Sequence, residues 1–127
     1  MSALEHFVKI FKALGEPTRL KILKLVALRP MYVCELEMVL GISQPRISQH
    51  LRVLKEAGLL SESKEAQKTF YALKKQFLEE NLAAFHAFLA SPLSALPDFA
   101  AEAARLAEAE SQGLAEKCCP AGRCGRD

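Results

Sequence analysis

The stretch that most constrains the fold is residues 43–58, SQPRISQHLRVLKEAG, whose pattern predicts a single helix. Ile47, Leu51 and Leu54 recur at helical spacing and predict one buried stripe. The serine that opens the segment is a favourable N-cap, the proline two residues later fits a first helical turn, and the final glycine ends the pattern. Because such a helix is stabilised mainly by packing of its apolar face, we expect the rest of the chain to pack against that face and to present the opposite one.

The face opposite this stripe is polar and basic. Gln49 and Arg52 lie on it at 100° per residue, and within residues 43–58 no carboxylate precedes Glu56. Amide, hydroxyl and guanidinium groups match base edges and phosphates, so this face is a candidate DNA-binding surface. The alternative is the solvated side of an ordinary bundle helix. The candidate DNA contacts on this segment are Ser43, Gln44, Arg46, Ser48, Gln49, His50, Arg52 and Lys55.

Helical spacing of apolar residues also predicts the neighbouring elements. The other expected helices cover residues 3–14, 17–28, 32–40, 77–90 and 98–117, the last of them capped by Asp98. Apolar residues cover most of the circumference of the 17–28 helix, which we therefore expect at the centre of the core. Gly41 separates a short helix from a longer one, and this order is that of a helix-turn-helix.

Two short strands are predicted directly after the helix-turn-helix, at residues 59–63 and 69–73. The polar residues between them would form the tip of a hairpin. A hairpin directly after a recognition helix is a wing, and Lys64, Gln67 and Lys68 are its candidate phosphate or minor-groove contacts. The alternative is a solvated turn.

The expected fold is mainly α-helical with a small β-hairpin wing, a dimeric winged helix-turn-helix. Its predicted parts are a DNA-binding and dimerisation domain over residues 1–91, a linker and C-terminal helix over 92–117, and a cysteine-containing tail over 118–127. Apolar side chains cover two neighbouring faces of the 77–90 helix, more than one small domain needs. We expect a partner subunit to bury the excess, together with the 3–14 helix.

Charge and hydropathy limit the class of protein. Residues 43–75 hold seven Lys or Arg and three Glu, whereas residues 76–116 hold one Arg and seven Asp or Glu. The basic middle favours a polyanionic partner. No apolar run could span a bilayer and none resembles a signal peptide, so we expect a cytoplasmic protein without a membrane partner. An enzyme is not expected, because the sequence has no phosphate loop and no nucleophile with an evident base.

Four motifs resemble those of one family of regulators. They are LGEPTRLKIL at residues 14–23, VCEL at 33–36, the Ser-Gln pairs and the His-Leu pair within 43–51, and LKEAGL at 54–59. Together they resemble the ArsR/SmtB family of winged-helix, metal-responsive repressors, over roughly residues 4–90. The resemblance implies a homodimer that binds an inverted-repeat operator in double-stranded DNA near its own promoter. It also implies that an inducer releases the DNA.

The cysteines and histidines bear on the inducer. Many arsenic sensors that this chain resembles carry CVCDLC in the third helix, whereas residues 32–37 here are YVCELE and lack two of the three thiols. The family's zinc site on the last dimer helix needs paired histidines and carboxylates, and His86 has no second histidine downstream. Cys118, Cys119 and Cys124 remain, and this tail is similar to that of arsenite sensors in which the trivalent site moved within the fold.

Three thiolates suit a soft, trivalent ion. They match the pyramidal geometry that arsenic(III) or antimony(III) accepts, whereas a structural zinc site needs a fourth ligand. We therefore expect arsenite as the inducer and no organic cofactor. Another soft metal such as cadmium, lead or zinc, thiol oxidation, and a functionless end are alternatives for the tail. A metal-storing adaptor that binds protein instead of DNA is an alternative for the whole chain.

Two single residues have open roles. Cys34 lies on an otherwise apolar stretch with Val33 and Leu36, which favours a buried core position over a ligand role. His50 lies at the edge of the 43–58 helix, between its buried and exposed faces. A phosphate contact and a structural hydrogen bond are equally open for its imidazole.

Overall fold

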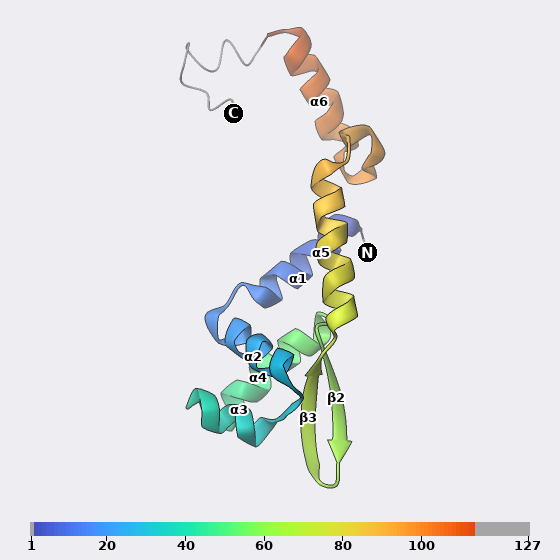
Figure 1. Ribbon diagram of the computed structural model, residues 1–127. Coiled ribbons are helices and arrows are strands. Elements are labelled where there is room, and N and C mark those ends of the chain that lie inside the picture. The colour runs from blue at the N-terminus through green and yellow to red at the C-terminus, as the bar shows by residue number, and fades with distance from the viewer. Residues whose placement is uncertain (1, 114–127) are drawn as a thin grey trace. The chain divides into compact units, whose positions relative to one another are not determined.

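The computed structural model describes residues 2–113 and has the helix-turn-helix and wing expected from the sequence (Figure 1). Its elements are α1 (Ala3–Leu14), α2 (Pro17–Leu28), β1 (Met31–Tyr32), α3 (Val33–Leu40), α4 (Gln44–Glu56), β2 (Leu60–Glu65), β3 (Lys68–Leu73), α5 (Lys75–Ala90), the 3-10 turns η1 (Leu93–Ala95) and η2 (Pro97–Phe99), and α6 (Ala100–Ser111). The chain divides into two compact units, the first ending at Ala87 and the second beginning at Phe88.

Among the described residues, helix α4 supplies three of the six largest fully buried side chains. The stripe expected from its spacing is confirmed, because Ile47, Leu51 and Leu54 are fully buried. Leu36 of α3 and Leu59 after α4 are fully buried with them. Burying a leucine or isoleucine side chain contributes roughly 1.5–3 kcal/mol, so these contacts hold α4 firmly in one orientation.

The sequence predicted that the 17–28 helix lies at the centre of the core, but only one side of this helix is buried. Ile22 and Val26 are buried, but Leu20 is 51% and Leu28 is 65% exposed. Helix α2 contacts α1, α4 and β3, and these neighbours cover only one of its faces. The apolar residues around the whole circumference of α2 therefore led to a prediction of more burial than the structure has.

The sheet has three antiparallel strands in the order β1-β3-β2, one more strand than the sequence predicted. Tyr32, expected in a helix, pairs with Phe70 in the added strand β1, and its ring meets the Phe70 ring edge-on at 5.6 Å. The wing tip is also tighter than expected. Strands β2 and β3 are paired as far as Glu65 and Lys68, so the turn contains two residues.

The ends of α4 agree with the prediction in position but not in every contact. Ser43 is the N-cap residue, yet its side chain makes no capping hydrogen bond within the described chain. The helix ends at Glu56, two residues before the predicted glycine stop. Gly41 and Gly58 have φ angles of +66° and +87°, conformations that favour glycine.

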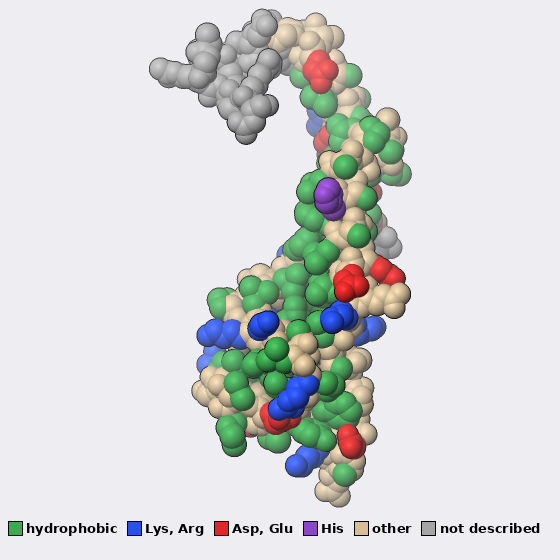
Figure 2. Space-filling model, in the orientation of Figure 1, with side chains coloured by type: hydrophobic (Ala, Val, Ile, Leu, Met, Phe, Trp, Pro, Cys, Tyr) green, Lys and Arg blue, Asp and Glu red, His purple; other side chains and the backbone are tan. Residues whose placement is uncertain are grey.

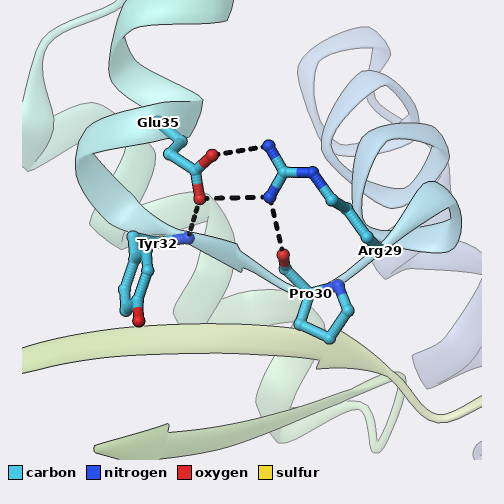
Figure 3. Close-up of polar contacts among 4 residues, drawn as sticks. All are labelled: Arg29, Pro30, Tyr32 and Glu35. Carbon is cyan, nitrogen blue, oxygen red and sulfur yellow. Dashed lines mark hydrogen bonds and ion pairs between the residues drawn. The ribbon is translucent and has the colours of Figure 1, made fainter. Parts of the chain in front are cut away.

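An ion pair joins the end of α2 to the start of α3 (Figure 3). Arg29 Nη2 lies 2.6 Å from Glu35 Oε2, and the backbone N–H of Tyr32 donates to Glu35 Oε1 at 3.0 Å. The Arg29 hydrogen bond, aided by the Tyr32 N–H, lowers the pKa of Glu35 to about 2. Glu35 therefore caps α3 and fastens it to α2.

Replacing Glu35 by glutamine should make the protein less stable at neutral pH but not at pH 2. The pKa of Glu35 is about 2 in the folded protein, below its ordinary value of 4.5. Its contribution is therefore complete above pH 4.5 and is lost as the pH falls toward 2. Urea unfolding of both proteins across this range should show a difference that shrinks with acid. A difference that stays constant from neutral pH down to the pKa of Glu35 would contradict this role.

In the second unit, the segment before the last helix is more structured than the expected linker. Turns η1 and η2 follow each other, and the Phe88 and Phe99 rings lie 5.9 Å apart. Asp98 lies inside η2, and Phe99 occupies the N-cap position of α6, so the predicted Asp98 cap is wrong. Helix α6 ends at Ser111, earlier than expected.

Candidate nucleic-acid interface

Helix α4 presents the expected polar face to solvent. The exposed candidates on it and at its start are Ser43, Gln44, Arg46, Gln49, Arg52 and Lys55, and Ser48 is half-buried. Figure 2 shows Lys and Arg side chains spread over the first unit on the face drawn, with apolar side chains between them. Because the buried stripe fixes the rotation of α4, these groups project together and can meet the edge of a duplex.

The first turn of α4 holds two of the candidates in contact. Gln44 Nε2 donates to Ser48 Oγ at 2.7 Å, one helical turn later. This bond orders both side chains at the end of the helix where the free backbone N–H groups favour a phosphate. Each side chain keeps further hydrogen-bonding capacity for a base or a phosphate.

Lys55 is positioned by the wing. Its Nζ lies 3.3 Å from Glu62 Oε1 on β2, and Tyr71 of β3 donates its hydroxyl to Glu62 Oε2 at 2.5 Å. Burial and the Glu62 hydrogen bond raise the pKa of Tyr71 to about 12, so this hydroxyl stays protonated as a donor. The cluster ties both wing strands to α4. No sequence pattern indicated Glu62, because its role depends on partners in two other elements.

The wing residues Lys64, Gln67 and Lys68 are exposed, as a DNA contact requires. Lys68 also has an internal partner, since its Nζ lies 5.5 Å from the centre of the Tyr32 ring. The predicted tip is corrected in one respect. Lys64 and Lys68 belong to the paired strands, and only Ala66 and Gln67 form the turn.

His50 faces inward. Its side chain is 17% exposed, and its Nδ1 lies 3.4 Å from Arg19 Nη1 and 3.6 Å from Glu16 Oε2. Of the two roles open from the sequence, this geometry favours the structural hydrogen bond. Sequence reasoning missed Arg19 and Glu16, although both lie in the motif at the start of α2.

Cys34 is exposed, so its predicted place in the core is wrong. It lies in the first turn of α3, where Leu36 is the side chain that the core covers. A shallow cavity of about 290 Å³ opens beside it, lined by Tyr32, Val33, Cys34, Glu37, Gln44, Lys68 and Thr69.

The predicted metal ligands Cys118, Cys119 and Cys124 lie outside the described residues. Within residues 2–113, no group of three or more His, Cys, Asp or Glu side chains is placed to hold a metal ion. In that same part of the chain, no helix has the length and apolar character to cross a membrane.

Helix α4 buries one apolar stripe and exposes a polar face, and the β2–β3 hairpin follows it. This arrangement is that of a winged helix-turn-helix DNA-binding protein. The model of the family described as "Bacterial regulatory protein, arsR family" matches residues 16–62. The HTH-type transcriptional regulator MJ1325 of Methanocaldococcus jannaschii is 43% identical over 81 residues, which cover 63% of this chain and 91% of that protein. The chain belongs to the arsR family of DNA-binding transcriptional repressors, and it is not an enzyme.

One solved structure and one further regulator are also similar to this chain. HlyU from Vibrio cholerae is 32% identical in structure-based alignment, with a TM-score of 0.56, over 68% of this chain and 95% of that chain. The arsenic resistance transcriptional regulator ArsR1 of Pseudomonas putida is 42% identical over 65 residues. That match covers 50% of this chain and 51% of that protein.

Proposed function

We propose that this repressor acts in the cytoplasm as a homodimer, and that it releases its operator when Cys118, Cys119 and Cys124 bind arsenic(III) or antimony(III). The observation that carries the DNA-binding half is the polar face of α4 above its fully buried stripe. The sensing half is supported by three thiols within seven residues, together with the likeness of half of the chain to a regulator named for arsenic resistance. The genes controlled would then protect against the same metalloids.

The proposed dimer buries the outer face of α1. Leu4, Val8 and Phe11 recur on this face and are 40%, 44% and 37% exposed. The other face of α1 packs against α5, where the rings of the buried Phe7 and of Phe85 meet edge-on with centres 5.4 Å apart. Helix α5 adds Leu82, which is 46% exposed. A contiguous apolar face of this kind is typical of a subunit interface.

In the proposed complex, α4 of each protomer enters the major groove and the wing follows the backbone. The candidates on α4 and the wing then divide into base contacts and phosphate contacts. Gln44, Ser48 and Gln49 have side chains that match base edges, whereas Arg52 and Lys64 match phosphates.

Replacing Arg52 by alanine should weaken binding to every DNA sequence to a similar degree. The loss of one phosphate contact per protomer should also reduce the slope of log K against log salt by about 0.9 for each contact. Fluorescence anisotropy at several salt concentrations measures both effects. Lys24→Ala, which removes an exposed charge from α2, is the matched control and should leave the slope unchanged.

In the proposed sensing step, As(OH)3 exchanges its three As–O bonds for three As–S bonds to the cysteines. Each hydroxide takes a thiol proton and leaves as water, so arsenic stays trivalent. A soft, three-coordinate ion is favoured because three cysteines occur together without a fourth thiol in the tail. The bound ion then favours the conformation with lower operator affinity. This coupling is reciprocal, so operator DNA must weaken arsenite binding by the same factor.

A Cys118, Cys119, Cys124→Ser protein should bind operator as the wild type does but lose its response to arsenite. The reason is that serine hydroxyls are poor ligands for a soft ion. Gel shift with and without arsenite measures the outcome, and Cys34→Ser is the matched control that should keep the response. Release of the triple variant by arsenite would contradict the ligand assignment. Release of the wild type only by cadmium, lead, zinc or oxidant would assign the tail to that inducer instead.

A further inference from the structure

Arg19, in the first turn of α2, contacts separate elements of the first unit. Its Nε donates to the carbonyl oxygen of Ala13 at 2.6 Å, and its Nη2 donates to that of Lys12 at 3.1 Å. Its Nη1 lies 3.4 Å from Nδ1 of His50 in the middle of α4. One guanidinium group thus joins the last turn of α1 to the recognition helix.

The geometry at His50 defines the direction of this hydrogen bond. A guanidinium group can only donate, so Nδ1 of His50 must accept and the ring proton must lie on Nε2. The Glu16 carboxylate orders the start of α2, because its Oε2 accepts the backbone N–H of Arg19 at 3.0 Å, and it lies 3.6 Å from Nδ1 without a hydrogen bond to it in this tautomer. Glu16 therefore helps to fix the backbone of Arg19, and Arg19 supplies the hydrogen bond to the imidazole.

Arg19 bridges two surfaces with different roles. Helix α1, whose last carbonyl groups it binds, carries the exposed apolar side chains Leu4, Val8 and Phe11. Helix α4, whose His50 it binds, carries the exposed polar face. Arg19 itself is half-buried behind this face, so its charge is committed to internal acceptors.

We propose that Arg19 is a positioning residue that transmits the placement of α1 to the recognition helix through His50. The orientation of α4 against a DNA half-site then depends on the position of α1, and therefore on how the two protomers meet. This inference rests on the proposed dimeric mode of DNA binding. A lysine cannot replace Arg19, because its single ammonium group cannot span three acceptors in the fixed plane of a guanidinium group.

The test is a double-mutant cycle on operator affinity. The probes are an operator duplex that the wild type selects from random sequence and an unrelated duplex of equal length. Arg19→Lys should weaken operator binding by about tenfold, a typical size for a coupling between two sites. Binding to the unrelated duplex and the salt slope should not change. In a His50→Leu background, Arg19→Lys should change operator affinity less than about twofold, because the shared contact is already absent.

Two further measurements separate this role from a general effect on stability. Urea unfolding establishes that each variant is folded at the assay temperature. His50→Asn, which keeps an acceptor near the position of Nδ1, should retain operator specificity, whereas His50→Leu should lose it. This pair tests the bridge even if Arg19→Lys does not fold.

Additive effects of the two substitutions would overturn the proposal. A salt slope reduced by about 0.9 for each protomer would also overturn it, because Arg19 would then be a phosphate contact. Equal loss of affinity for both duplexes would contradict a role in positioning. Failure of the wild type to select any operator would instead contradict the proposed function and is distinguishable from these outcomes.

Discussion

Replacing Val8 by glutamate should convert the dimer into monomers and weaken operator binding by about 100-fold or more. Two linked binding modules gain a factor of roughly 10²–10⁴ over one alone, and this gain is lost when the protomers separate. Val8 is 44% exposed on α1, so the substitution places a charge in the proposed interface without opening the core of the protomer. Sedimentation velocity measures the oligomeric state and anisotropy measures the affinity.

Val39→Glu is the matched control. Val39 is a 60% exposed valine on α3, away from the α1 face, and the same charge there should leave the protein dimeric. Urea unfolding should show both variants folded. A Val8→Glu protein that remains dimeric, or a monomer that binds operator as tightly as the wild type, would contradict the proposed interface.

Replacing Gly58 by alanine should lower the free energy of unfolding by about 2–4 kcal/mol. Two effects add at this position. Gly58 has a φ of +87°, which disfavours a residue with a side chain, and a Cβ atom there would lie 2.8 Å from Cζ of Phe77. Moving the Phe77 ring away would disturb its contacts, because it meets His6 edge-on with ring centres 6.1 Å apart and Lys74 Nζ lies 5.6 Å from its centre.

Gly41→Ala separates these two effects. Gly41 has a similar φ of +66°, but no atom of residues 2–113, its chain neighbours aside, lies within 4 Å of the position that an alanine methyl group would take. It should therefore lose only about 1 kcal/mol, the cost of the backbone conformation. Equal losses in urea unfolding for the two variants would show that Phe77 yields without cost. The junction between α4 and α5 would then be looser than its packing indicates.

Local spacing predicted the elements whose burial is set within one segment. The stripe of Ile47, Leu51 and Leu54 could be read directly, because a helix of this length presents every third or fourth residue to the same neighbour. The turn at Gly41 was equally readable, because a positive φ favours glycine. From these features the helix-turn-helix and the exposed face of α4 followed.

The errors concern features that depend on distant partners. Strand β1 is two residues long and exists through its pairing with β3, almost forty residues later in the chain. Cys34 stands beside apolar residues but is turned to solvent, because a short helix such as α3 has only one covered side. Leu20 and Leu28 are exposed for the same reason.

The residues of the candidate site likewise fall into a group that the sequence predicted and a group that it did not. The exposed DNA-binding candidates were readable from the polar face of one helix and the tip of one hairpin. The groups that position them, Arg19, Glu16 and Glu62, were missed because each acts across two or three elements. A charged side chain in a sequence does not indicate whether its partner is DNA or another helix.

The most direct test of the sensing mechanism is one arsenite titration that is monitored through two signals at once. Labelled operator is held by the wild-type protein, and arsenite is added while anisotropy and thiolate absorbance are recorded together. Arsenite should bind to sulfur and raise the operator Kd by about 5–150-fold in the same concentration range. If the protein holds its operator while arsenite, antimonite and divalent soft metals all leave the affinity unchanged, the proposed sensing by the C-terminal thiols is wrong.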